Sequence, residues 1–150
     1  MRAVVQRVKQ AYVEIEGKEI ARIGMGLCCL VGFETGDTAE DIDRIARKIC
    51  TLRVFEDEQG LMNLDVGEVK GGILLVSQFT LLGDARRGRR PSFTAAEQPD
   101  QAARLFDETV RHVSRLHPGT VVSGRFQTTM DVHLVNHGPV TILLDSRRLF

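Results

Sequence analysis

Apolar runs of strand length fill most of this 150-residue chain, and only two segments repeat apolar residues at helical spacing. The first repeat covers residues 42–52 and follows Asp37 and Glu40, which have the spacing of a capping box. The second begins near Pro99 and ends at Pro118. Strands are expected over residues 2–8, 12–16, 19–23, 27–33, 53–56, 73–80, 121–128, 131–135 and 140–144. Two helices among many strands predict an α+β fold, and no linker or repeat divides residues 1–150, so one domain is expected.

A glycine-proline step interrupts the last strand pattern at Gly138 and Pro139. Proline cannot donate a hydrogen bond to a neighbouring strand, so Pro139 belongs at a turn or a bulge. A bond before proline costs only about 0.5–1 kcal/mol in the cis form, and tight turns are where such bonds are kept. The step is either a plain hairpin corner or a place where two backbone carbonyls point outward together.

Polar side chains follow the buried strand pattern of residues 73–76 at the point where that strand is expected to end. They are Ser77, Gln78 and Thr80. Three hydrogen-bonding groups at a strand end are typical of a binding site, although serine and threonine also serve as turn and capping residues.

Charge is balanced at 20 basic and 20 acidic residues, so any contact with nucleic acid must be local. The densest cluster is basic and consists of Arg86, Arg87, Arg89 and Arg90. Such a run is either a solvated loop or a site for phosphate groups.

Several chemistries lack their sequence signatures. The four histidines and three cysteines do not have zinc-site spacing, and no glycine-rich phosphate loop or nucleophile elbow occurs. No cofactor and no metal are therefore expected. The cysteines read as buried thiols of a reducing compartment, and no secretory or membrane-spanning segment is visible, so a cytoplasmic location is expected.

Three motifs in this order resemble the D-aminoacyl-tRNA deacylase family: residues 77–81, residues 90–93 and residues 136–141. The opening residues 1–8 are also similar to that family's first strand, so the resemblance covers the whole chain. It implies a strongly curved, barrel-like antiparallel or mixed sheet with two main helices. It also implies a homodimer, with active sites at the subunit interface, that hydrolyses the ester between a D-amino acid and the 3′ end of tRNA. Glycyl-tRNA mischarged on tRNA-Ala is a further implied substrate.

The resemblance also assigns roles to residues. It places catalysis at Ser77, Gln78, Phe79 and Thr80. It makes Gly138 and Pro139 a cis pair that acts in the partner subunit's site and rejects L-amino acids. Substrate or tRNA binding falls to Arg86, Arg87, Arg89, Arg90, Phe93 and Met130. Phe79 and Phe93 can stack on the terminal adenine, while core packing is an equal alternative for Phe79.

An aminoacyl ester is already activated, so a site need only position the attacking group and stabilise the oxyanion. Backbone N–H groups near Phe79 and Thr80, helped by Gln78, fit that task. In the family, Thr80 is either a nucleophile or a polar anchor, and the 2′-hydroxyl of the terminal ribose can assist. No base adjacent to Thr80 is visible in the sequence, so we assign Thr80 to positioning.

The chain departs from the family pattern after Phe126, where Gln127 and Thr128 replace a usual pair of small residues, and at His137, where an acidic residue is common. Both changes concern substrate preference more than reaction type. Two other functions stay open. One is a module that binds tRNA ends without catalysis, and the other is a deacylase of small D-amino-acid esters that ignores RNA.

Overall fold

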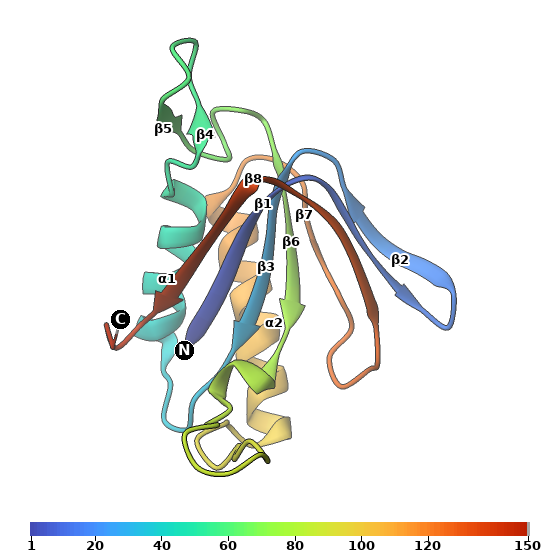
Figure 1. Cartoon of the computed structure of the whole chain (residues 1–150), viewed down its shortest axis with the longest axis vertical. Coiled ribbons are helices and arrows are strands. Elements are labelled where there is room, and N and C mark those ends of the chain that lie inside the picture. Colours follow the sequence, from blue (N-terminus) through green and yellow to red (C-terminus); the bar gives the residue numbers. More distant parts are fainter. Residues whose placement is uncertain (150) are drawn as a thin grey trace.

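The computed structural model describes residues 1–149 and contains one main sheet, two helices and a small hairpin (Figure 1). The helices are α1 (Ala39–Thr51) and α2 (Pro99–Leu116), and a short 3-10 turn, η1, spans Phe79–Leu82. The strands are β1 (Arg2–Ile15), β2 (Lys18–Ile23), β3 (Gly26–Gly32), β4 (Phe55–Glu56), β5 (Met62–Leu64), β6 (Gly72–Ser77), β7 (Val121–Ser123) and β8 (Asp131–Asp145). The α+β prediction is confirmed.

The sheet is mixed, in the order β2-β1-β3-β6-β7, with β8 paired to the other side of β1. Strand β1 is antiparallel to β2, β3 and β8, whereas β3, β6 and β7 run parallel. Because the carboxyl ends of β3 and β6 lie at the same edge, the segments that follow them are brought together there.

Apolar residues cover both faces of the central strands. The helices pack on one face, where Leu27, Ile73 and Leu75 contact the apolar stripes of α1 and α2 (Figure 1). Cys28 and Leu74 point to the opposite face and pack against the second half of β1. Strand β1 therefore serves both cores, and its bend gives the sheet its barrel-like curvature.

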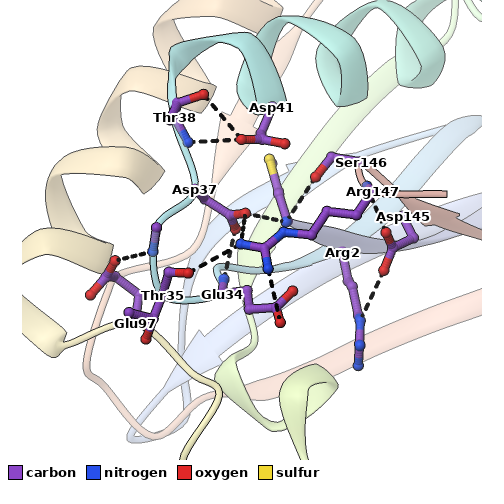
Figure 2. A network of polar contacts seen from close by, with 12 residues as sticks. Arg2, Glu34, Thr35, Asp37, Thr38, Asp41, Glu97, Asp145, Ser146 and Arg147 are labelled. Carbon is purple, nitrogen blue, oxygen red and sulfur yellow. Dashed lines mark hydrogen bonds and ion pairs between the residues drawn. The ribbon is translucent and has the colours of Figure 1, made fainter. Parts of the chain in front are cut away.

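Helix α1 begins one residue later than the sequence indicates. Thr38 is the N-cap, and its backbone N–H donates to the Asp41 carboxylate at 2.9 Å (Figure 2). The capping pair predicted at Asp37 and Glu40 is wrong, because Asp37 is occupied by a contact distant in sequence.

Asp37 accepts a hydrogen bond from the Met1 ammonium at 2.6 Å, and both groups are fully buried. The same ammonium donates to the Ser146 hydroxyl at 2.9 Å. Arg147 reaches the same carboxylate at 3.4 Å and pairs with Glu34 at 3.2 Å (Figure 2). These contacts fasten Met1, which precedes β1, and the segment after β8 to the loop before α1.

Two predicted strands are too long. Strand β6 ends at Ser77, so Thr80 lies in the 3-10 turn and not in the strand. Strand β7 ends at Ser123, and residues 124–130 form a loop in which Gln127 has a positive φ of 54°.

The glycine-proline step lies inside one long strand, not between two. On β1, Gln6 pairs with Thr141 and Val8 pairs with Asn136, so a single residue of β1, Arg7, lies opposite the four β8 residues 137–140. The extra residues form a bulge at Gly138 and Pro139, and the peptide bond between these two is cis. The expectation of a bulge is confirmed, and the alternative of a plain hairpin corner is wrong.

Within residues 1–149, no helix is long and apolar enough to cross a lipid bilayer. Cys28 and Cys29 are buried and all three cysteines are free thiols.

Candidate active site

A cavity of about 530 Å³ opens at the edge where β3 and β6 end. One wall comes from the ends of these strands, one from the first turns of α2 and one from the loop between β7 and β8. The lining includes Gly32, Phe33, Val76, Ser77, Gln78, Phe79, Glu97, Ala102, Phe126, Gln127, Thr128, Thr129 and Met130. Clefts beyond the carboxyl ends of parallel strands are common binding sites in sheets of this kind.

Four of the predicted site residues meet at this cavity: Ser77, Gln78, Phe79 and Met130. Thr80 lies beside it, and the Gln78 amide nitrogen donates a hydrogen bond to the Thr80 hydroxyl. This bond makes the Thr80 oxygen an acceptor, which fits an anchor.

The turn after β6 presents backbone donors next to the cavity. The first N–H groups of a helical turn have no partner within that turn, and Gln78 supplies no side-chain cap for those of η1. The predicted oxyanion donors at Phe79 and Thr80 therefore lie in a conformation in which their N–H groups are available to a ligand.

The loop between β7 and β8 forms the side of the cavity that carries Gln127 and Thr128, the two residues expected from the sequence to depart from the family pattern. Gln127 has left-handed backbone, a conformation that costs a residue with a side chain about 1–2 kcal/mol. Thr128 is half-buried, and its hydroxyl donates to the Phe126 carbonyl at 3.3 Å. The Met130 sulfur accepts the Arg125 N–H at 3.3 Å, which fixes this side chain in the cavity wall.

Glu97 was not anticipated from the sequence, where it stands two residues before the expected helix start. It is the only ionisable residue among those lining the cavity. Its carboxylate accepts the Gln98 N–H at 2.8 Å and the Gly36 N–H at 3.3 Å, so it also ties the start of α2 to the loop after β3 (Figure 2). Only its proximity to Pro99 hints at this position in the sequence.

The four arginines of the basic loop are exposed and lie outside the cavity. Phe93, which follows them, contacts Phe79 edge to face with ring centroids 5.1 Å apart. Phe79 remains 58% exposed, so its alternative assignment to the core is wrong.

Gly138 and Pro139 are exposed and do not line the cavity of their own chain. Asn136 holds the bulge, because its side-chain oxygen accepts the Val140 N–H and its amide donates to Thr141, both at 3.1 Å. The predicted catalytic and gate residues are thus not brought together within one subunit.

Arg7 binds the backbone of the bulge, a role that was not predicted from the sequence. Its Nε donates to the His137 carbonyl at 3.0 Å, and its Nη1 donates to the Val54 carbonyl at 2.7 Å. The signal was available: Ala3 and Val5 alternate toward the core, and the next position in that alternation is a charged residue that is 5% exposed.

The family model described as D-Tyr-tRNA(Tyr) deacylase matches residues 4–145. The chain belongs to this family. It is 55% identical to the D-aminoacyl-tRNA deacylase of Kosmotoga olearia and 52% identical to that of Thermotoga petrophila, and each match covers all of both chains. Members of this family are hydrolases of ester bonds, and the chain is accordingly an enzyme of that class.

Solved structures agree with the fold. The c-Myc DNA Unwinding Element Binding Protein superposes with a TM-score of 0.92 at 39% identity, over 97% of this chain and 98% of that one. A probable eukaryotic D-amino acid tRNA deacylase superposes with a TM-score of 0.77 at 20% identity, over 95% and 97%. The barrel-like deacylase fold implied by the resemblance is confirmed.

Titratable groups near the family's motifs do not form a metal centre. Among the described residues 1–149, no three histidine, cysteine or acidic side chains are grouped so as to hold a metal ion. What the site offers is a cavity, backbone donors, the Ser77 hydroxyl and the Gln78 amide. These groups can bind and polarise an ester.

Proposed function

We propose that this chain hydrolyses the ester between a D-amino acid and the 3′ end of tRNA, releasing the amino acid and the tRNA. The observation that carries the proposal is the turn at residues 77–80, which presents its polar groups beside a cavity in a member of the deacylase family. Residues 1–150 act as one deacylase domain, and the enzyme works in the cytoplasm as a proofreader of translation.

In the proposed mechanism the aminoacyl end of the tRNA enters the cavity. The N–H groups of Phe79 and Thr80 stabilise the oxyanion, with Ser77 and Gln78 beside them. Thr80 positions the ester, and water or the 2′-hydroxyl of the terminal ribose attacks the carbonyl carbon. The C–O bond to the ribose then breaks, the leaving oxygen takes a proton, and no cofactor takes part.

Binding of the terminal nucleotide uses both aromatic and basic groups. Phe93 and Met130 contact the adenine, because unpaired bases stack on aromatic and apolar side chains. The arginines Arg86, Arg87, Arg89 and Arg90 were predicted to meet the phosphates, and their exposure on a loop that begins three residues after η1 supports this.

In this proposal, residues of one subunit select for D-amino acids in the active site of the other subunit. Gly138 and Pro139 protrude from β8, and in a homodimer their carbonyls reach the partner's cavity, hold the substrate amino group and leave no space for an L side chain. Val135 and Leu143, which flank the bulge, are 45% and 57% exposed, and such apolar surface favours association with a second copy. Glycine has no side chain to exclude, so glycyl-tRNA is also cleaved.

The direct test is release of amino acid from matched D-, L- and glycyl-tRNA by the purified protein with EDTA present. Fast D cleavage, slow L cleavage and loss of D cleavage in Gln78→Ala support the proposal. A folded dimer that does not cleave D-aminoacyl-tRNA overturns it.

A second candidate is a nucleic-acid-binding module without hydrolysis, favoured by the name of the related c-Myc DNA Unwinding Element Binding Protein. It predicts that tRNA or DNA binds equally well to the wild type and to Gln78→Ala, and that neither protein releases amino acid. A third candidate, a small-ester deacylase, predicts equal cleavage of a D-amino-acid ester that lacks tRNA.

A further inference from the structure

The basic loop is closed at its base. Asp84 and Ser92 exchange two backbone hydrogen bonds, at 2.8 Å and 2.9 Å, so residues 85–91 form a loop whose two ends are held together. Gly88 at its tip has a positive φ of 73°, as a tight turn requires. A loop with fixed ends loses less entropy when it binds a ligand than a mobile run of charge does.

The closed loop is also attached to the candidate active site. On the side that leads to α2, Phe93 contacts Phe79 and lies against Gly83, where an added Cβ would be only 2.9 Å from the Phe93 ring. Farther along, the Thr35 N–H donates to the Ala95 carbonyl at 3.0 Å. A ligand held by the loop is therefore held at a defined place relative to the turn after β6.

The four arginines of this loop differ in their surroundings. Arg86 donates to the Asp84 carboxylate from its backbone N–H at 3.0 Å, from Nε at 2.9 Å and from Nη2 at 2.7 Å. The hydrogen bonds from Arg86 hold the pKa of the Asp84 carboxyl well below its ordinary value, so this carboxylate is charged at physiological pH. Within residues 1–149, no side-chain hydrogen bond or ion pair engages Arg87, Arg89 or Arg90.

The Asp84 carboxylate weakens the attraction of Arg86 for a phosphate. An ion pair exposed to water is weak, so the pair by itself would not keep Arg86 from a phosphate. A phosphate that approached Arg86 would, however, also approach the negative charge of Asp84. The pair is neutral as a unit, and a neutral unit releases few counterions from RNA.

We infer that Asp84 is a positioning residue of an RNA-binding loop: it holds Arg86 as an internal brace, and only Arg87, Arg89 and Arg90 bind phosphate groups of the tRNA backbone. This inference rests on the proposed function. It reduces the set of arginines proposed to bind tRNA from four to three.

The test is the salt dependence of binding, measured with fluorescently labelled, deacylated tRNA in KCl between 50 and 400 mM. Each phosphate contact contributes about 0.7–0.9 to the slope of log affinity against log salt. Arg87→Gln, Arg89→Gln and Arg90→Gln each lower the slope by about that amount, whereas Arg86→Gln leaves it near the wild-type value. Arg47→Gln is the matched control, because Arg47 forms a similar exposed pair with Asp43 on α1.

Asp84→Asn gives the result that a merely structural role would not produce. Removal of the negative charge allows Arg86 to bind a phosphate of the RNA. The slope of log affinity against log salt therefore becomes steeper by about the amount that one phosphate contact contributes. The double variant Asp84→Asn with Arg86→Gln returns to the wild-type slope.

The inference is overturned if Arg86→Gln flattens the slope as much as Arg87→Gln does, or if Asp84→Asn does not steepen it. Wild-type binding without any salt slope also overturns it, even where the protein cleaves D-aminoacyl-tRNA and the proposed function stands. Failure of the wild type to cleave D-aminoacyl-tRNA rejects the proposed function alone, because the slopes are measured with uncharged tRNA.

Discussion

Arg7 donates to the carbonyl oxygen of His137 at 3.0 Å, and this bond links the middle of β1 to the bulge that carries Gly138 and Pro139. The guanidinium also donates to Val54 and lies 3.6 Å from the Glu56 carboxylate. A single buried cation therefore fixes the position of the proposed chiral gate relative to the core.

Arg7→Gln should weaken both stability and chiral selection. Hydrogen bonds from a charged group contribute about 1.5–3 kcal/mol each, and the carbonyls would lose their donors, so we expect the free energy of unfolding to fall by about 2–4 kcal/mol. D-aminoacyl-tRNA cleavage at a temperature where the variant is folded should fall at least about tenfold. Arg22→Gln, which removes an exposed guanidinium paired with Glu19, is the control and should change neither quantity. Unchanged cleavage by Arg7→Gln would separate the bulge from the reaction.

Gly138→Ala should disable the gate without unfolding the chain. The residue has a φ of 128°, and an added Cβ would lie 2.9 Å from Arg7 Nη2 and 2.8 Å from Val140 Cγ2. We expect at least about a tenfold loss of D-aminoacyl-tRNA cleavage, or a gain of L cleavage, because the bulge must move. Gly24→Ala is the matched control, since its added Cβ meets nothing within 4 Å. Equal rates and equal chirality in Gly138→Ala and wild type would reject the gate.

Thr80→Val tests whether the threonine is an anchor or a nucleophile. The variant keeps the shape of the side chain and removes the hydroxyl that accepts from Gln78. If Thr80 is an anchor, the single-turnover rate of the variant should fall about tenfold. If Thr80 is the nucleophile, the rate should fall about 10⁴-fold or more. Thr80→Ser should keep nearly full activity in either case, so it controls for folding.

Asp37→Asn should destabilise the fold strongly. The Met1 ammonium would keep its buried position but lose the carboxylate that lies 2.6 Å from it. Removing one partner of a buried ion pair costs about 3–5 kcal/mol, which denaturant unfolding measures directly. Glu19→Gln, at an exposed pair, should leave the unfolding free energy nearly unchanged. A small effect of Asp37→Asn would mean that the ammonium finds another acceptor.

Stability should fall at alkaline pH because of the buried thiols. Burial raises the pKa of Cys28 to about 11, whereas a thiol in the unfolded chain ionises near its ordinary value of about 8.5. Between these values the unfolded state binds fewer protons than the folded state, so the free energy of unfolding decreases as pH rises. The stability that Cys28 contributes is complete below about pH 8.5 and is lost through about pH 11. Cys28→Ala should therefore show a shallower decline between pH 8 and pH 11 than wild type, by about 3 kcal/mol over the range. Parallel declines would contradict the shifted pKa.

Local pattern predicted the secondary structure wherever burial repeats with a regular period. The stripe of Ile42, Ile45 and Ile49 identified α1, and the apolar run of residues 73–76 identified β6, because each faces one core along its length. Ends were less predictable. Thr80 lies in the 3-10 turn after β6, and Gln127 lies in the loop after β7, which lines the cavity.

Contacts between segments distant in the chain could not be predicted from the sequence pattern. Asp37 has the residue type and the spacing of a helix cap. Its carboxylate instead accepts a hydrogen bond from the Met1 ammonium, and Thr38 caps α1. A local contact was also missed: Arg86 is one of four similar arginines in the sequence, and only the structure shows its pairing with Asp84, two residues earlier.

By itself, the sequence determined the two helices, the strand-rich fold class, the polar segment at residues 77–80 and the family, because these depend on short-range periodicity and on ordered motifs. The tertiary structure alone decided that β8 is one strand with a bulge, that Arg7 holds this bulge, and that Glu97 enters the cavity wall. The physical reason is that each of these features is a contact between segments that lie far apart in the chain. Such a feature depends on how strands pair, and no local period encodes that pairing.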